Sequence, residues 1–137
     1  AAPCAADELC APRCGAECRR IKEETGVTAN EYQKKAMATL NPALSEREIL
    51  LNSVMGLCGE SGEAIDIVKK WLMQGHTLDK THLAKELGDV AWYLAEAATA
   101  LGMELDDILQ GNLDKLAARF PDGFDTQRSQ QRRADDL

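Results

Sequence analysis

The chain has 137 residues and a formal net charge of −7 at pH 7, which suits a single domain and argues against a protein that coats nucleic acid through a basic face. Aromatic residues make up only 4% of the chain, and this scarcity favours helices over sheets. No apolar run approaches the roughly 20 residues that cross a bilayer, and no secretory signal is recognisable. We therefore expect an all-α, cytoplasmic protein with no membrane or nucleic-acid partner.

Residues 1–27 are rich in Ala, Cys and charged side chains, and they contain four of the five cysteines, at positions 4, 10, 14 and 18. Few bulky apolar residues are present to bury, so this segment is predicted to be an extension that is poorly structured or forms a short helix. The cysteine spacing is not Cys-x-x-Cys, which makes a metal site or a disulfide the less favoured interpretation.

Two capping boxes, in which a hydroxyl residue precedes a Glu by three positions, predict the starts of the first two helices. They are Thr28 with Glu31, and Ser45 with Glu48. The first helix is expected to reach Leu40 and the second about Gln74, where Gly75 is a plausible stop.

The second helix carries an apolar stripe and three internal glycines. The stripe consists of Leu50, Val54, Leu57, Ala64, Val68 and Leu72. Cys58, beside this stripe, is predicted to be a small core residue. Gly56, Gly59 and Gly62 each weaken a helix, which indicates either close approach by another backbone or a substrate, or simply tolerated weakness.

A third helix is predicted from Asp79, as its cap, to Leu101, and a fourth over residues 104–120. The third helix has a second apolar stripe, formed by Leu83, Leu87, Val90, Leu94, Ala98 and Leu101. The polar residues 125–137 are expected to form a disordered tail. The whole is predicted to be a four- to five-helix bundle built on an antiparallel hairpin of the second and third helices.

Four acids lie on the flanks of the two stripes. Glu60 and Glu63 are three residues apart on the second helix, and Glu86 and Asp89 repeat this spacing on the third, so each pair shares a helix face. Counted from Gly75, the two pairs are nearly equidistant. An antiparallel hairpin would therefore place Glu63 level with Glu86 and Glu60 level with Asp89, and four carboxylates would converge.

Convergent carboxylates repel one another unless a proton or a cation compensates their charge. Oxygen ligands without Cys or His favour a hard cation, Mg²⁺ with Mn²⁺ as the alternative. His76 and His82 flank the turn and are badly placed as ligands. The competing interpretation is a set of solvated surface acids on a non-enzymatic helical adaptor. A di-iron bundle is disfavoured because it requires Glu-x-x-His pairs, and the P-loop pattern of switch NTPases is absent.

Several other polar side chains could meet a phosphorylated substrate. Lys70 returns to the face of Glu63 after seven residues, and Tyr93 lies one turn beyond Asp89. Both have structural alternatives, as a snorkelling lysine and a packed aromatic residue. Trp71 could stack on a base, although packing is the favoured interpretation. Asn112, Lys115 and Arg119 share one face of the fourth helix, which is either a solvated flank or a triphosphate contact.

The acid motif resembles that of the MazG-like nucleoside triphosphate pyrophosphohydrolases, which belong to the all-α NTP pyrophosphatase superfamily. Glu-x-x-Glu and Glu-x-x-Asp are separated by 22 residues, within Gly-Glu-Ser-Gly-Glu-Ala and Lys-Glu-Leu-Gly-Asp-Val-Ala-Trp-Tyr-Leu. The similarity extends from about Tyr32 to Phe124 and includes Asn112-Leu113-Asp114-Lys115-Leu116.

The resemblance implies an all-α catalytic domain over residues 28–124. It further implies Mg²⁺-dependent hydrolysis of an NTP or dNTP, including noncanonical ones, to monophosphate and pyrophosphate as a nucleotide-pool house-cleaning activity. Glu60, Glu63, Glu86 and Asp89 would hold the metal, with Glu63 the chosen candidate for activating water. Asn112, Lys115 and, less firmly, Arg119 would contact phosphate, and the chain would form a homodimer or homotetramer.

Overall fold

The computed structural model describes residues 26–131, which form five α-helices and no strand. In chain order these are α2 (Ala29–Met37), α3 (Glu46–Gln74), α4 (Lys80–Ala100), α5 (Leu105–Arg119) and α6 (Thr126–Gln130). The expected all-α class is confirmed within this range. None of the described helices is both long enough and apolar enough to span a bilayer. The expectations for the first 25 residues, including their four cysteines, lie outside the described residues.

The helix starts follow the capping signals in the sequence. Thr28 and Ser45 both form complete capping boxes, at the N-termini of α2 and α3 respectively, and the Asp79 side chain accepts a hydrogen bond from the His82 amide at 2.9 Å at the start of α4. At the end of α3, Gly75 adopts the left-handed conformation, with φ of 72°, which satisfies the last carbonyl groups at no steric cost.

The first helix ends earlier than expected. α2 stops at Met37 rather than reaching Leu40, because the chain turns after Met37 through bonds from the Thr39 and Leu40 amides to carbonyls three residues back. The Thr39 hydroxyl also donates to the Ala36 carbonyl at 2.7 Å. Such bonds compete with the next helical turn, so the helix ends before Pro42 can act on it.

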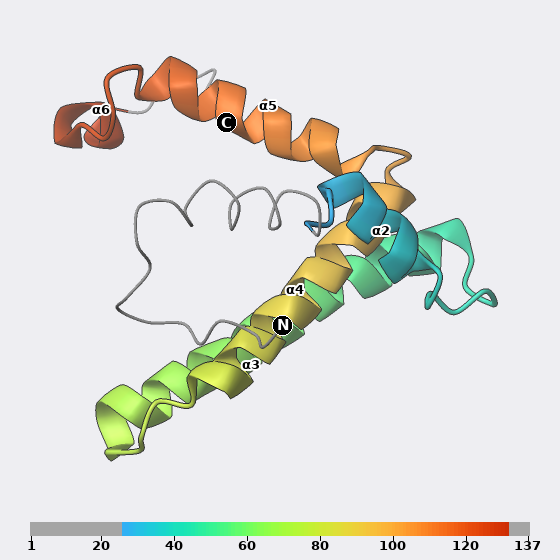
Figure 1. The fold of residues 1–137 in the computed structure, drawn as a ribbon, viewed down its shortest axis with the longest axis horizontal. Helices are drawn as coiled ribbons and strands as arrows, with labels where there is room; N and C mark the ends of the chain where they lie inside the picture. Colours follow the sequence, from blue (N-terminus) through green and yellow to red (C-terminus); the bar gives the residue numbers. More distant parts are fainter. Residues whose placement is uncertain (1–25, 132–137) are drawn as a thin grey trace, which may run out of the picture.

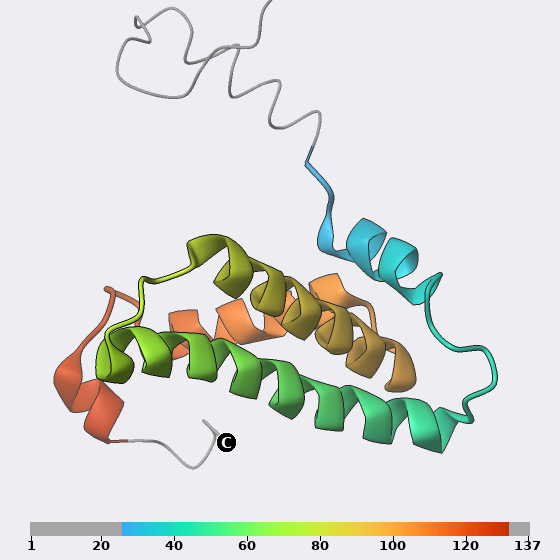
Figure 2. The same cartoon turned by 90° about the horizontal axis from the view of Figure 1, so that it is seen from below.

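α3 and α4 lie side by side along most of their lengths and run in opposite directions, joined by residues 75–79 (Figures 1 and 2). α2 packs across the end of α4 that is remote from this turn. The small buried core lies there, and it is formed by Ala36, Ala95, Ala98 and Leu105. The Trp92 indole joins α4 to α2 by donating to the Ala36 carbonyl at 3.2 Å and the Thr39 hydroxyl at 2.9 Å.

The direction of α5 is determined by α2. Glu104 precedes α5 and provides no side-chain cap. Instead, the Gln33 side-chain oxygen Oε1 accepts from the Leu105 amide at 2.7 Å, and the Asn30 side-chain oxygen Oδ1 accepts from the Asp106 amide at 2.9 Å. The Gln33 amide nitrogen also donates to the Thr99 hydroxyl and the Met103 carbonyl, both at 3.0 Å. From this junction α5 diverges from the hairpin (Figure 1).

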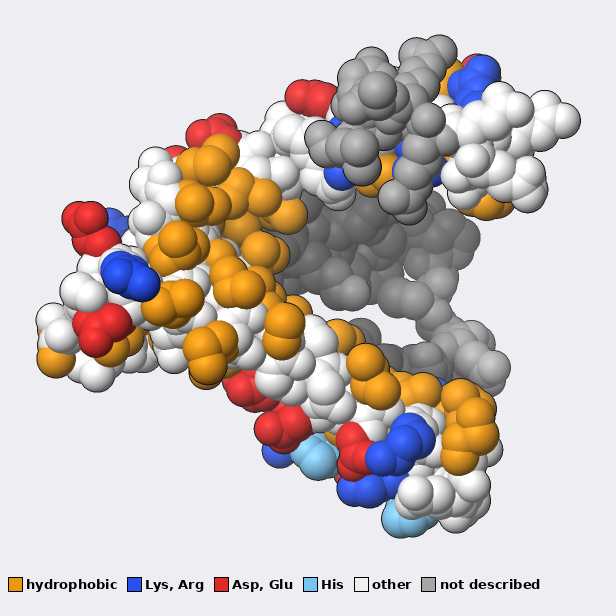
Figure 3. Space-filling view, turned by 180° about the vertical axis from the view of Figure 1, so that it is seen from behind, with side chains coloured by type: hydrophobic (Ala, Val, Ile, Leu, Met, Phe, Trp, Pro, Cys, Tyr) orange, Lys and Arg blue, Asp and Glu red, His pale blue; other side chains and the backbone are white. Residues whose placement is uncertain are grey.

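Many apolar side chains of the described region are exposed. Figure 3 shows them gathered along the hairpin, and those on α3 are Leu50, Leu51, Val54, Met55, Ile65, Trp71, Leu72 and Met73. The predicted stripes are therefore only partly covered, since Leu87 on α4 and Leu101 directly after it are exposed as well. The prediction that Cys58 is a core residue was wrong, because its side chain faces solvent. Periodicity identified the helices but not the surface that covers each face.

The C-terminal segment is more ordered than expected. α6 lies within the segment that was expected to be a disordered tail, and Asp125 caps it by accepting from the Arg128 amide at 2.8 Å. Arg119 connects α5 to this segment by donating to the Ser129 carbonyl at 3.1 Å. The expectation of disorder was therefore wrong for residues 126–130.

Candidate functional site

The seam between α3 and α4 has small and polar residues at its centre. A Cβ atom added to Gly56 would lie 2.1–2.4 Å from three ring atoms of Tyr93, so the glycine at this position allows the aromatic ring to pack directly on the α3 backbone. Glu60 is four residues nearer the turn than Gly56, and Asp89 is four residues nearer than Tyr93. The observed contact therefore places the two acid pairs level with each other.

Three of the four acids meet at this level. Glu60, Glu63 and Glu86 each offer a carboxylate oxygen, and these oxygens lie within 4.8 Å of one another. Glu86 is buried, Glu60 is half-buried and Glu63 is exposed. Asp89 lies outside that group but close enough for its charge to act on Glu60. The cluster is thus open to solvent at Glu63 and Asp89, whereas the Glu86 side chain is buried.

The charges of the cluster change its proton affinity. The pKa of Glu60 is raised above its usual value of 4.5, first by desolvation and then by the nearby charges of Glu63, Asp89 and Glu86. The pKa of the Tyr32 phenol is raised by burial and by the charge of Asp89. Both shifts have the sign expected for acidic groups that are partly desolvated and lie near other negative charges.

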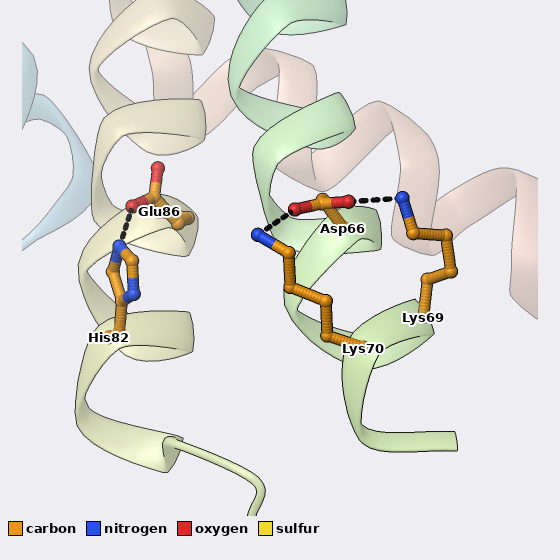
Figure 4. Close-up of polar contacts among 5 residues, drawn as sticks. All are labelled: Asp66, Lys69, Lys70, His82 and Glu86. Carbon is orange, nitrogen blue, oxygen red and sulfur yellow. Dashed lines mark ion pairs between the residues drawn. The ribbon is translucent and has the colours of Figure 1, made fainter. Parts of the chain in front are cut away.

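A histidine contacts the buried member of the cluster. His82 lies one turn before Glu86 on α4, and its Nε2 atom is 2.8 Å from a Glu86 carboxylate oxygen (Figure 4). The expectation that His82 is poorly placed to join the acid cluster as a ligand missed this contact. The imidazole occupies one oxygen of Glu86 and fixes the orientation of that carboxylate.

Two lysines lie near the cluster and share one acid. Asp66 pairs with Lys69 and, at 2.6 Å, with Lys70. In Figure 4 the Lys70 ammonium group lies on the side of Asp66 toward α4 and Glu86, whereas that of Lys69 lies on the opposite side. The hydrogen bonds from the lysines lower the pKa of Asp66 to about 2, so the Asp66 carboxyl is ionised at neutral pH. Lys70 is the cation presented toward the hairpin seam.

Tyr93 is positioned mainly by packing. Its ring lies on Gly56 and makes an edge contact with Trp92, with ring centroids 5.1 Å apart and an interplanar angle of 86°. On the other side of α4, the Tyr32 hydroxyl donates to the Gly88 carbonyl at 3.4 Å. The sequence left open whether the three α3 glycines allow close approach by a backbone or a substrate or are merely tolerated. At Gly56 an aromatic ring approaches closely, whereas a Cβ at Gly59 or Gly62 would meet nothing within 4 Å.

The structure does not bring the α5 residues to the acid cluster. Asn112, Lys115 and Arg119 lie on the helix that diverges from the hairpin (Figure 1). Asn112 and Lys115 are exposed. The Arg119 guanidinium lies over the Phe120 ring, 4.9 Å from its centroid, in addition to its bond to Ser129. Arg119 therefore holds the C-terminal segment rather than facing the cluster within the same chain.

Sequence reasoning missed one buried acid. The Glu96 side chain has no exposed surface, and both of its carboxylate oxygens accept from the Asn52 amide nitrogen at 3.0 Å. Glu96 is seven residues beyond Asp89, which keeps it on the same face of α4. This seven-residue spacing could have indicated that Glu96 lies on the face of the acid cluster, although α3 carries no acid that would pair with it.

The donor set of the cluster fits a hard divalent cation. It consists of carboxylate oxygens only, with the nearest imidazole already bound to Glu86. Mg²⁺ takes oxygen ligands and retains several waters, so a cluster that is open on one side suits it better than a closed cage would. The raised pKa of Glu60 is consistent with a site whose negative charge a cation would balance.

Comparison with known proteins agrees with this arrangement. The model of the MazG nucleotide pyrophosphohydrolase domain matches residues 50–124, which contain both acid pairs. The gene 37 protein of Mycobacterium phage L5 is 42% identical over 69 residues, a stretch that covers 47% of this chain and 60% of the phage protein. The chain thus spans less than two thirds of that relative. No solved structure was found to match.

Proposed function

Because the chain belongs to the MazG nucleotide pyrophosphohydrolase family, we propose that it hydrolyses a nucleoside triphosphate to the monophosphate and pyrophosphate. The substrate would be an NTP or dNTP, including noncanonical ones, and the role would be nucleotide-pool house-cleaning. The observation that supports this most directly is the convergence of Glu60, Glu63 and Glu86 within 4.8 Å. Solvated surface acids have no reason to converge against their mutual repulsion.

The acids would act together with a divalent cation, Mg²⁺ or Mn²⁺. When bound, the ion supplies positive charge against the triphosphate oxygens and lowers the pKa of a bound water. Glu60, Glu63 and Glu86 would hold it, with Asp89 completing the set. His82 would keep the Glu86 carboxylate oriented through the observed 2.8 Å contact.

The exposed Glu63 is the proposed base. Its carboxylate lies on the open side of the cluster, where it would orient an attacking water and accept its proton as the oxygen adds to the α-phosphorus. The bond between the α-phosphorus and the bridging oxygen would break, and pyrophosphate would leave. The Lys70 amine is presented toward the seam, so it would steady the negative charge of that leaving group.

The remaining predicted contacts would be completed by assembly. Asn112 and Lys115 are exposed on α5 and lie away from the cluster of their own chain. The many exposed apolar side chains of α3 support a homodimer or homotetramer, in which these α5 residues, with Arg119 placed less favourably, would reach phosphate. Tyr93, one turn beyond Asp89, would reach a substrate phosphate or a carboxylate of the cluster.

The test is a panel of NTPs and dNTPs offered with Mg²⁺ to the full chain, with monophosphate and pyrophosphate measured separately. We expect equimolar release of the two from at least one substrate, no turnover in EDTA, and a loss of at least about 100-fold in kcat for Glu63→Gln, which keeps the side-chain shape but cannot accept the proton. Thr81→Ala, on an exposed position of the hairpin, is the matched control and should retain full activity.

Two outcomes would contradict the proposal. Release of orthophosphate together with a nucleoside diphosphate would mean that a different phosphoanhydride bond is broken. Absence of turnover across the whole panel would favour the alternative function, a non-enzymatic helical adaptor that uses its exposed apolar faces to bind a partner.

A further inference from the structure

Glu96 is a buried carboxylate that the proposed chemistry does not use. It has no exposed surface, and within residues 26–131 its oxygens accept hydrogen bonds only from the Asn52 amide nitrogen. No cation pairs with it among the ion pairs of the described region. A buried carboxylate with one neutral partner is costly, and apolar residues would fill the same space more favourably. Packing alone therefore does not account for an acid at this position.

The Asn52–Glu96 bond lies on the same seam as the acid cluster. On α3, Asn52, Gly56 and Glu60 follow one another at intervals of four residues. On α4, Glu96 is three residues beyond Tyr93, and Tyr93 contacts Gly56. The bond is therefore about 12 Å along α3 from Glu60, on the side remote from the turn.

The cluster is thus held between two connections. On one side, residues 75–79 join α3 and α4 covalently. On the other side, Asn52 joins α3 to α4 through Glu96. Between them, Glu60 and Glu63 on α3 oppose Glu86 and Asp89 on α4, and their like charges push the helices apart when no cation is present. Without the second connection, that separation near the cluster would be opposed only by the turn and by packing such as that of Tyr93 on Gly56.

We propose that Glu96 is a positioning residue for the metal site, which acts through Asn52 to keep α3 and α4 at the spacing and register that a divalent cation requires. The inference rests on the proposed function only in taking the acid cluster as the cation site. Loss of the bond would reduce the fraction of molecules in which the acids are correctly placed. The apparent dissociation constant for the cation rises by the same factor.

The test measures Mg²⁺ binding by isothermal titration calorimetry on the full chain, stripped with EDTA and free of nucleotide. Asn52→Asp places a second carboxylate against Glu96 and should weaken Mg²⁺ binding by about tenfold or more, at unchanged stoichiometry. Glu96→Gln retains an amide-to-amide hydrogen bond and should weaken it by only about threefold. The double variant Asn52→Asp/Glu96→Gln restores a carboxylate–amide bond with its direction reversed, and should return the affinity to within about threefold of the unchanged chain.

A merely structural role is separated by a control on the same helix. Ser45→Ala removes the side-chain cap of α3 and should lower Tm by several degrees while leaving Mg²⁺ affinity unchanged. The proposal is overturned if Asn52→Asp leaves the affinity within twofold, if the double variant is no better than Asn52→Asp, or if Ser45→Ala weakens Mg²⁺ binding in proportion to its loss of Tm. Should Asn52→Asp fail to fold, Glu96→Gln must still weaken binding more than Ser45→Ala does.

The measurement is independent of turnover. If the unchanged chain binds Mg²⁺ but cleaves no nucleotide, the proposed function fails and the role of Glu96 is still decided by the variants. If the unchanged chain cleaves nucleotide and the variants bind Mg²⁺ normally, the role of Glu96 is overturned and the proposed function stands. If the unchanged chain binds no Mg²⁺ without nucleotide, the role of Glu96 is overturned, and the nucleotide panel alone decides the proposed function.

Discussion

At the scale of single residues, the acid cluster makes folding and proton binding interdependent. Glu60 has a raised pKa because its carboxylate is partly desolvated and faces the charges of Glu63, Asp89 and Glu86. In the metal-free chain the folded state therefore binds a proton more tightly at Glu60 than the unfolded state, whose value is near 4.5. The contribution of this group to stability is largest at low pH and is lost as pH rises from about 4.5 through the raised folded pKa.

This coupling predicts the effect of Glu60→Gln in EDTA. At pH 7 the variant should have a higher Tm than the unchanged chain, because one of the repelling charges is removed, and the difference should shrink toward pH 4, where Glu60 gains its proton. Glu48 is the matched control, since hydrogen bonds with Ser45 lower its pKa. Glu48→Gln should lower Tm at pH 7, an effect that disappears as pH falls below 4.5. Thermal denaturation monitored by circular dichroism measures both.

The opposite order for Glu60→Gln would show that the acids of the metal-free chain do not destabilise it. In that case, the Tm of Glu60→Gln minus the Tm of the unchanged chain would be smaller at pH 7 than at pH 4. Saturating Mg²⁺ supplies a second comparison, because the cation should raise the Tm of the unchanged chain more than that of the variant.

At the scale of the elements, the α3 glycines separate into two kinds. Gly56 admits the Tyr93 ring, whereas a Cβ at Gly59 would meet nothing within 4 Å. Alanine at either position gains about 1 kcal/mol of helix propensity. At Gly56 this gain is opposed by overpacking, which costs about 1–3 kcal/mol. The added Cβ would lie only 2.1–2.4 Å from three ring atoms of Tyr93, and so close an approach indicates the upper part of that range.

We therefore expect Gly56→Ala to reduce the free energy of unfolding by about 1–2 kcal/mol and Gly59→Ala to increase it by up to about 1 kcal/mol. Urea denaturation of the two variants at one pH in EDTA measures both changes. A Gly59→Ala variant that is more stable yet has a raised KM for its nucleotide would indicate that substrate approaches the backbone there. Equal stability changes at the two positions would contradict the packing of Tyr93 on Gly56.

The limits of sequence prediction are also clearest at this scale. The capping boxes of Thr28 and Ser45, the Asp79 cap and the left-handed Gly75 were all predictable, because each signal is local. For Glu96, the spacing from Asp89 could have indicated its helix face, but its burial was not predictable because it depends on a partner 44 residues away. The exposure of Cys58 was misjudged for the same reason: the apolar stripe beside it is not covered by another element.

The divergence of α5 shows the same limit for the candidate site. Their spacing in the sequence predicted that Asn112, Lys115 and Arg119 share one helical face, and all three do lie on α5. The direction of that helix depends on Asn30 and Gln33, whose side chains accept from its first amides. Neither residue carries a sequence signal for such a distant bond, so the distance from α5 to the acids could not be predicted.

At the scale of the whole molecule, the ratio of buried to exposed apolar side chains is unusually low for a monomeric protein. Within residues 26–131 four apolar side chains are buried, all small except Leu105, while sixteen large ones are exposed. Exposed apolar patches of this kind mark contact surfaces. Ile65 is 67% exposed on α3 and faces the apolar groove that also includes Val68, Leu72 and Leu83.

We accordingly predict that the chain self-associates and that Ile65→Glu weakens this association by about tenfold or more, because a carboxylate would be buried without a partner. Sedimentation velocity over a range of concentrations measures the dissociation constant. Thr81→Glu adds the same charge to an exposed polar position of the hairpin and should leave the constant unchanged. A chain that sediments as a monomer at every concentration would contradict the prediction.

The capping of α5 by α2 bears on how the protein can be shortened. A recombinant fragment cut at the edges of the matched family region, residues 50–124, would lack both Asn30 and Gln33. Two main-chain N–H groups at the head of α5 would then lose their acceptors, and Trp92 would lose both of its own. Expression trials that seek a minimal soluble unit should therefore start upstream of Thr28.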